Sequence, residues 1–297
     1  MRGANEAIAG TLGTASRRAW SPVVWRLAGE HPLGAAGALL ILVTVVAAIF
    51  APVLAPQDPL RIFAERRLTP PGGDFLLGTD NLGRDLLSRI IYGARVSVTM
   101  GTLSVLLGST AGAIVGLVSG YLGGHVDMLV QRLVDTLMAF PLLILAVAVV
   151  AILGPAPEHV VIAIALVLVS QAARVVRSAT LSVKAAQYVE AARAVGCDSS
   201  RILFVHVLPQ CVAPFIIVAT AAIGWAIVVE ASLSFLGVGT PPPTPTWGGM
   251  LSGAARVYAR EAPWMVIFPG VAISLAVFGF NLLGDGLRDI LDPRLRK

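Results

Sequence analysis

Six long stretches of this 297-residue chain contain no Asp, Glu, Lys or Arg, and they limit what it can fold into. They lie at about residues 33–54, 97–122, 136–153, 160–173, 212–229 and 264–283. A bilayer core of about 30 Å is crossed by roughly 20 apolar residues in a helix, so we predict six membrane spans, the short fourth one extended to about 155–174. Backbone groups in lipid must bond within their own segment, which requires helices, and no repeated alternation typical of a β-barrel is present.

The composition supports a membrane protein. Apolar residues make up 56% of the chain and charged residues only 13%, where soluble domains have about 25% charged residues. This excludes a soluble enzyme, a disordered tail and a secreted disulfide scaffold. The net charge is +5, but the arginines are spread between the apolar stretches, so we expect no nucleic-acid partner. Cys197 and Cys211 belong to no metal-binding or disulfide pattern, and we expect no metal site.

The positive charges predict how the chain is oriented. With the N-terminus inside, the inner segments hold 14 Lys and Arg and the outer segments hold 8, which favours a cytoplasmic N-terminus and C-terminus. Residues 1–30 are then a cytoplasmic arm. An alternative is that the first stretch is a cleaved signal peptide, because residues 53–55 resemble a cleavage site; against this, the apolar stretch is long and starts late.

Residues 82–94 have the periodicity of an amphipathic helix. Apolar residues recur every four positions at Leu82, Leu86, Ile90 and Ala94. Asp85 and Arg89 are four apart and can pair, and Thr79 or Asp80 is placed to cap the helix. Two interpretations stay open: a helix lying in the membrane interface before the second span, or a solvated helix on the outer surface.

The second span contains a stripe of small residues. Its members, each four positions from the next, are Ser104, Gly108, Gly112, Gly116 and Gly120. Small residues at this spacing allow the backbone of another helix to approach closely. The stripe therefore predicts either tight packing within the chain or a helix crossing that moves when the protein changes state.

The longest inner loop, residues 174–210, has an ordered internal pattern. Residues 188–195 are Ala-rich and helical, and Gly196 is a natural terminator. Asp198, Ser199 or Ser200 is placed to cap a second short helix, and Pro209 is expected to break the chain before the fifth span. The first helix has a small-residue face, so it either docks on a soluble partner or is an ordinary amphipathic loop.

Several kinds of chemistry have no signature in this sequence. The two lysines follow no Gly-rich turn, so a phosphate-binding loop is not expected, and no hydrolase motif is present. Glu230, at the outer end of the fifth span, is the deepest acid. Because ion-coupled carriers and intramembrane enzymes both need ionisable groups at membrane depth, a passive pathway driven from elsewhere is favoured over either class.

Four stretches in order give a specific resemblance. Glu190-Ala191-Ala192, Gly196 and Leu208-Pro209 resemble the EAA signature of permease subunits of binding-protein-dependent ABC importers. Three residues separate Ala192 from Gly196, and Leu208 follows twelve residues after it, as in that signature. Residues 77–95, 230–248 and 280–293 resemble the C-type permease subunit of the dipeptide, oligopeptide and nickel group. The resemblance covers about residues 33–297.

The resemblance implies a fold, a division of the chain and a coupling site. The fold is the all-α type I ABC importer permease fold with six transmembrane helices. Residues 31–95 would hold the first span and the amphipathic segment, and residues 96–297 the permease domain, with the cytoplasmic coupling loop at 174–210. The residues that would couple the chain to an ATPase are Tyr188, Glu190, Ala191, Ala192, Arg193, Gly196, Leu208 and Pro209.

The resemblance also implies partners. These are a homologous second permease subunit, two ABC ATPase subunits that bind ATP and Mg²⁺, and an extracytoplasmic substrate-binding protein; this chain itself would bind no cofactor and catalyse no reaction. The chain would lie in the cytoplasmic membrane, and the cargo moved across that membrane would be a dipeptide or oligopeptide, with nickel chelates and glutathione as alternatives. Export of the cargo is a rival to import. Glu230 would either cap its helix and meet an arginine or face the pathway and meet a peptide amine.

Overall fold

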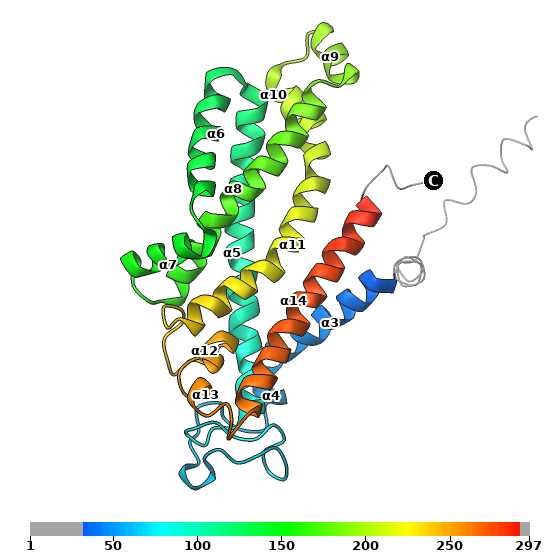
Figure 1. Cartoon of the computed structure of the whole chain (residues 1–297). Coiled ribbons are helices and arrows are strands. Elements are labelled where there is room, and N and C mark those ends of the chain that lie inside the picture. Colours follow the sequence, from blue (N-terminus) through cyan, green and yellow to red (C-terminus); the bar gives the residue numbers. More distant parts are fainter. Residues whose placement is uncertain (1–31, 292–297) are drawn as a thin grey trace, which may run out of the picture.

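Long helices dominate the computed structural model, which describes residues 32–291 (Figure 1). Within that range the regular elements are helices, and the loop before α5 contains isolated bridges such as the one between Gly72 and Phe75. Five helices are long and apolar enough to cross a membrane: α3 (Pro32–Ile49), α5 (Leu86–Leu122), α8 (Pro157–Lys184), α11 (Leu208–Phe235) and α14 (Trp264–Leu291). The bent pair α6 (Gly124–Ala139) and α7 (Leu142–Leu153) makes a sixth span if it is counted as one.

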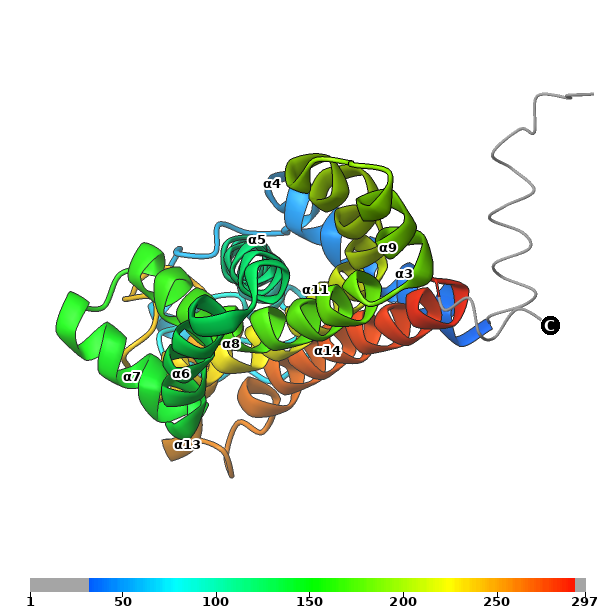
Figure 2. The same ribbon diagram turned by 90° about the horizontal axis from the view of Figure 1, so that it is seen from above.

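Helix α5 is the centre of the bundle. It packs along α8 and against α11 and α3, while α3 and α11 both pack against α14. Seen from above, α6 and α7 lie on one flank and α3 on the other (Figure 2). One buried cluster joins α5, α7, α8 and α11, and a second joins α3, α5, α11 and α14.

The short elements gather at the two ends of the bundle (Figure 1). One end, called here the α9 end, has α9 (Gln187–Ala194), α10 (Ser199–Arg201) and the π-helix η2 (Ile202–Val207). The opposite end, called the α12 end, has α4 (Ala51–Leu54), η1 (Ala64–Arg66), α12 (Trp247–Leu251) and α13 (Ala254–Val257). Helices α3 and α11 run from the α9 end towards the α12 end, and α5, α8 and α14 run back.

The predicted third span is not one straight helix. It is broken between α6 and α7, which meet at 92°. The residue before a proline is pushed out of the helical region, and Phe140, which precedes Pro141, is extended at φ −83° and ψ 138°. The helical segment also begins earlier than predicted, at Gly124. The prediction considered only uncharged stretches, whereas α6 contains charged residues among its apolar ones.

The predicted separate amphipathic helix is also wrong. Residues from Leu86 onward form the first turns of α5, continuous with the second span, and Asp85 is its N-cap, accepting a hydrogen bond from the Ser88 amide at 2.8 Å. Arg89 does not pair with Asp85 but lies 3.6 Å from the Asp80 carboxylate. This end of α5 is buried by other segments, including Trp247, whose indole donates to the Ile90 carbonyl at 3.0 Å.

The boundaries of the inner loop differ from the prediction at both ends. Helix α8 continues to Lys184, and the predicted break at Pro209 is absent, because residues 199–235 form one continuous helical segment. Pro209 lies in the first turn of α11, directly after η2. The Leu208 amide bonds to the Leu203 carbonyl, five residues back, and this wider π-type turn accommodates a proline that has no N–H of its own.

Candidate functional site

Helix α9 is a short helix with a well-defined end. Gly196 has φ +87°, a conformation that glycine adopts without strain. The Gly196 amide bonds to the Arg193 carbonyl at 3.0 Å, and the Cys197 amide to the Ala192 carbonyl at 3.1 Å. This pair of bonds is the Schellman arrangement that terminates helices. Asp198 then caps α10 by accepting from the Ser200 amide at 3.1 Å, and the hydrogen bonds from Ser200 hold the pKa of Asp198 below its usual range.

A small apolar cluster anchors α9 to the bundle. Val189 is fully buried and packs with Ile202 and Val207 of η2 and with Leu117 of α5. The ring of Tyr188 lies 6.3 Å from the ring of His206, also in η2. The single valine therefore fixes how α9 sits on the ends of the long helices.

The opposite face of α9 is open. Tyr188 is 48% exposed, and Glu190, Ala191 and Arg193 are exposed as well, while Ala192 is half-buried. Leu208 and Pro209 lie elsewhere, in the first turn of α11, where Leu208 packs on the buried cluster. The structure thus brings Tyr188 to Gly196 together as one surface, whereas Leu208 and Pro209 lie in the first turn of α11.

Tyr121, at the end of α5, ties this surface to the long helices. Its hydroxyl donates to the Ser199 carbonyl at 2.8 Å, and its own carbonyl accepts from Lys184 Nζ at 2.6 Å. Ser199 begins α10, and Lys184 ends α8. One residue therefore connects α5, α8 and the segment that follows α9.

Helix α6 is fastened to α8 by two ion pairs. Arg177 donates to Asp127 through two nitrogens, at 2.6 and 2.5 Å, and both side chains are largely shielded. Arg174 and Asp135 pair at 2.6 Å, but both are more than half exposed, so this pair adds little stability. The Arg177 pair sets the position of α6 near the α9 end.

The glycine stripe of α5 lies against α8. A Cβ added at Gly108, Gly112 or Gly116 would come within 2.2–2.3 Å of a backbone oxygen of α8, and one at Gly120 would lie 3.2 Å from Thr180. The backbones of α5 and α8 are in direct contact along this stripe. The two helices therefore have little room to move relative to each other and are expected to move as a unit.

Glu230 lies inside the bundle. Its side chain is fully buried, and Ser234 Oγ donates to Oε1 at 2.8 Å. Ser97 of α5 lies beside the carboxylate, but Glu230 Oε2 and Ser97 Oγ have no hydrogen-bond partner among the described residues. Glu230 meets no arginine among the described residues, and it does not line the 610 Å³ pocket beside Tyr92.

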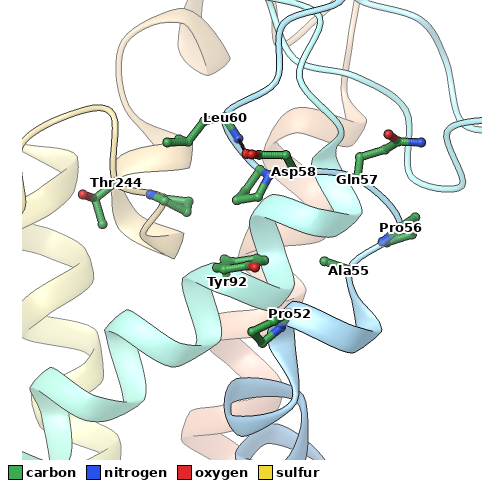
Figure 3. Close-up of a pocket in the computed structure, with 10 residues that line it drawn as sticks. Pro52, Ala55, Pro56, Gln57, Asp58, Leu60, Tyr92 and Thr244 are labelled. Carbon is green, nitrogen blue, oxygen red and sulfur yellow. Dashed lines mark hydrogen bonds between the residues drawn. The ribbon is translucent and has the colours of Figure 1, made fainter.

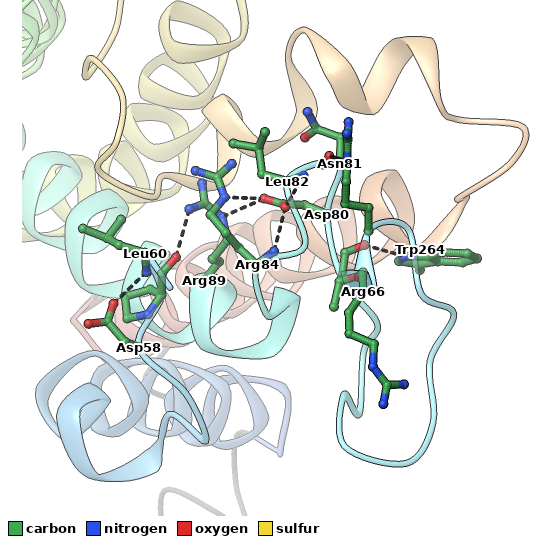
Figure 4. Close-up of polar contacts among 12 residues, drawn as sticks. Asp58, Leu60, Arg66, Asp80, Asn81, Leu82, Arg84, Arg89 and Trp264 are labelled. Atoms are coloured by element: carbon green, nitrogen blue, oxygen red, sulfur yellow. Dashed lines mark hydrogen bonds and ion pairs between the residues drawn. The ribbon is translucent and has the colours of Figure 1, made fainter. Parts of the chain in front are cut away.

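A polar network organises the α12 end (Figure 4). Asp80 accepts from Arg84 Nε at 2.6 Å and lies 3.6 Å from Arg89 Nε, and Arg89 Nη1 donates to the Pro59 carbonyl at 3.1 Å. The Trp264 indole donates to the Thr79 carbonyl at 3.1 Å, which joins the loop to α14. These contacts hold residues 56–85 against the first turns of α5.

A pocket of about 610 Å³ opens beside this network (Figure 3). Tyr92 of α5 forms one wall, Pro52 and residues 55–60 a second, and Thr244 and Pro245 a third. This pocket is a concave surface at the α12 end of the bundle, opposite to α9.

The sequence did not reveal the supporting residues of the site. Val189, Tyr121 and Lys184 belong to no motif, and the contacts of Tyr121 join residues more than 60 positions apart. The only available signal was that Val189 is the one large aliphatic residue of α9.

Comparisons with known proteins agree with this architecture. Residues 108–297 match the family described as binding-protein-dependent transport system inner membrane component, and residues 20–71 match the N-terminal transmembrane domain of oligopeptide transport permease C. A di/tripeptide transport system permease protein of Pseudomonas aeruginosa is 48% identical over 273 residues, covering 90% of each chain.

Two further relatives are similar over comparable lengths. A dipeptide transport system permease protein of Alkalihalophilus pseudofirmus is 43% identical, covering 90% of this chain and 88% of that one. A glutathione transport system permease protein of Pectobacterium atrosepticum is 44% identical, covering 94% and 93%. The chain therefore belongs to the family of inner membrane components of binding-protein-dependent transport systems, as a permease of the C type with the type I ABC permease fold.

Proposed function

We propose that this chain is the permease subunit of an ATP-driven importer of dipeptides or oligopeptides, and that α9 docks on an ATPase subunit. The observation that carries the proposal is a short helix whose one face is anchored by a fully buried valine while the other face, with Tyr188 and Glu190, is open. The names of the relatives support a peptide cargo, and the glutathione permeases among them favour glutathione, itself a peptide, as the alternative.

The complete importer would contain three further kinds of protein. A homologous second permease would complete the pathway, two ABC ATPase subunits would carry ATP and Mg²⁺, and a binding protein would deliver cargo at the α12 end. The α9 end and both chain termini would face the cytoplasm, with the lysine and arginine bias of the sequence in support. The chain itself would make or break no bond.

The geometry suggests how movement would pass through the chain. Closure of the ATPase pair would push α9, and the Val189 cluster would carry that push to η2 and α11. Tyr121 would carry it to α5, and the tight α5–α8 contact would move both helices together. A ligand or partner shifts a conformational equilibrium only through differential contacts, which these links would supply.

The test is co-purification of the tagged chain in detergent, comparing wild type with Glu190→Arg. Glu190 is exposed, so the change should leave the fold intact while reversing a charge on the docking face. Glu261→Arg, also exposed but at the α12 end, is the matched control. We expect wild type and the control to bring down an ATPase and a second permease, and Glu190→Arg to retain only the second permease.

Loss of the ATPase in both variants, or in neither, would contradict docking at α9. A wild-type chain that brings down no ATPase under conditions that preserve membrane complexes would contradict the importer itself and favour a secondary carrier.

A further inference from the structure

Glu230 is an acid that the chain itself encloses. Its side chain has no exposed surface, so neither lipid, another subunit nor a cargo reaches it without a change in packing. Helix α5 approaches α11 closely beside it, since a Cβ at Gly101 would lie 2.9 Å from Ile227 Cγ1. Helix α12 covers the next residue, because a Cβ at Gly248 would lie 2.1 Å from the Ala231 oxygen. The partners of this carboxyl group must therefore come from the chain.

The groups that face the carboxyl are two hydroxyls. Ser234 Oγ, one turn further along α11, donates to Oε1 at 2.8 Å. Ser97 of α5, which is also fully buried, lies beside the carboxyl. Glu230 Oε2 and Ser97 Oγ are buried and lack a hydrogen-bond partner among residues 32–291. No lysine, arginine or histidine within that range forms an ion pair with Glu230.

These contacts suit a neutral carboxylic acid better than an anion. A buried carboxylate without a cation loses its hydration, and two hydroxyl groups do not replace it. A neutral carboxyl instead has one O–H donor, and this donor would give both Oε2 and Ser97 Oγ the partner that they lack. The hydrogen of the Ser97 hydroxyl stays free to donate one turn back, as Ser104 of the same helix does to the Met100 carbonyl at 2.8 Å.

We propose that Glu230 is held as the neutral acid and that its O–H donates to Ser97 Oγ. The two residues then form a latch between α11 and α5 on the side of the α12 end. At the α9 end, the hydroxyl of Tyr121 already ties α5 to the segment that leads into α11. The latch is the counterpart of that contact, and Glu230 is a positioning residue that touches no cargo. A bond between neutral groups also separates at a smaller cost than a buried ion pair, so α5 and α11 stay free to change their crossing.

The first test is the infrared C=O stretch of a protonated carboxyl. It is recorded on the full chain with its co-purified partners in nanodiscs, at mildly alkaline pH, where exposed acids are ionised. We expect this band in the wild type and its loss in Glu230→Gln. Ser97→Ala removes the acceptor, so the band should stay and move to higher frequency. Ser104→Ala is the matched control, because Ser104 is a buried serine of α5 that bonds to Met100 instead.

Two results would overturn the latch. A wild type without a protonated-carboxyl band has an ionised Glu230, which contradicts the proposal outright. A band at the same frequency in wild type, Ser97→Ala and Ser104→Ala would show that Ser97 is not the acceptor. The two serine variants each remove one hydroxyl only, so this comparison decides the question even if Glu230→Gln fails to fold.

The second test compares two conservative changes of the acid. Glu230→Gln keeps the length of the side chain and offers an N–H donor, whereas Glu230→Asp keeps the acid but is one methylene shorter and cannot reach both serines. We expect the glutamine variant to match wild type and the aspartate variant to lower the midpoint of thermal unfolding in detergent by roughly 2–6 °C. The same two changes at Glu261, an exposed residue at the α12 end, should leave the midpoint unaltered.

The order of the two variants separates a latch from an ionised acid. An acid that acts as an ion, by holding a cation or an amine, would tolerate aspartate better than glutamine, and that order would contradict the proposal. Transport of a dipeptide by the complex should follow the latch order, and this readout alone rests on the proposed function. A wild type that transports no peptide would contradict the proposed function, while the infrared and unfolding results would still decide the latch.

Discussion

At the scale of single residues, the same residue type has opposite consequences in different places. A Cβ at Gly112 would lie 2.3 Å from the Val169 oxygen, whereas one at Gly270, inside α14, meets nothing within 4 Å. The first glycine is required by a close approach of two backbones, and the second only costs helix propensity.

Gly112→Ala should therefore destabilise the protein by about 1–3 kcal/mol, because the α5 and α8 backbones must separate to admit the methyl group. Gly270→Ala should be neutral or stabilise by up to about 1 kcal/mol. The midpoint of thermal unfolding in detergent measures both. Equal effects of the two changes would argue against backbone contact along the stripe.

Tyr121 is the residue whose loss should separate ATP hydrolysis from transport. Tyr121→Phe removes one hydrogen bond, to the Ser199 carbonyl, worth about 0.5–1.5 kcal/mol. We expect transport per ATP hydrolysed to fall several-fold while the ATPase still co-purifies. The control is Tyr258→Phe, because the hydroxyl of Tyr258 donates no hydrogen bond within the described range. Unchanged coupling in Tyr121→Phe would show that this link transmits nothing.

At the scale of helices, the prolines show how far sequence patterns reach. Pro141 breaks a helix, while Pro209 lies in the first turn of α11 and Pro214 and Pro269 lie inside α11 and α14 without ending them. The local backbone differs at two of these prolines: the wider turn of η2 precedes Pro209, whereas Phe140, directly before Pro141, is extended.

The bend between α6 and α7 predicts a distance. From residue 128 to residue 152 a straight helix would span about 36 Å, whereas two equal arms at about 90° bring these positions to about 25 Å. Met128 and Ile152 are both exposed, and spin labels at these two positions, in a background with Cys197→Ser and Cys211→Ala, measure this separation. A distribution centred near the longer value would mean that the two helices form one straight span.

At the scale of the whole molecule, the two ends of the bundle differ in what they expose. The α9 end presents the open face of α9, which we propose as the docking surface, and the α12 end holds the Arg84–Asp80–Arg89 network and the pocket beside Tyr92 (Figures 3 and 4). An importer needs this asymmetry, since it receives its cargo on one side and its energy on the other.

The orientation of the two ends is testable in intact cells. Val195 and Val257 are 81% and 77% exposed at the α9 and α12 ends. An impermeant thiol reagent added outside should label Val257→Cys and leave Val195→Cys unlabelled until the membrane is permeabilised, because only the α12 end would face outward. The opposite pattern would reverse the proposed topology.

The sequence by itself determined the apolar helices that are long enough to cross a membrane, apart from the one broken at Pro141, together with the helical class, the end of α9 at Gly196 and the family. These follow from local properties: the length of apolar stretches, the conformational freedom of glycine and the spacing of a motif. Only the tertiary structure decided that Leu86–Ala94 belongs to α5, that Val189 anchors α9, that Tyr121 joins α5 to Ser199, and that Glu230 is buried beside Ser97 of α5. Those features depend on how helices distant in sequence cross, and a helix that is apolar on most faces has no periodic signal that distinguishes a buried face from an open one.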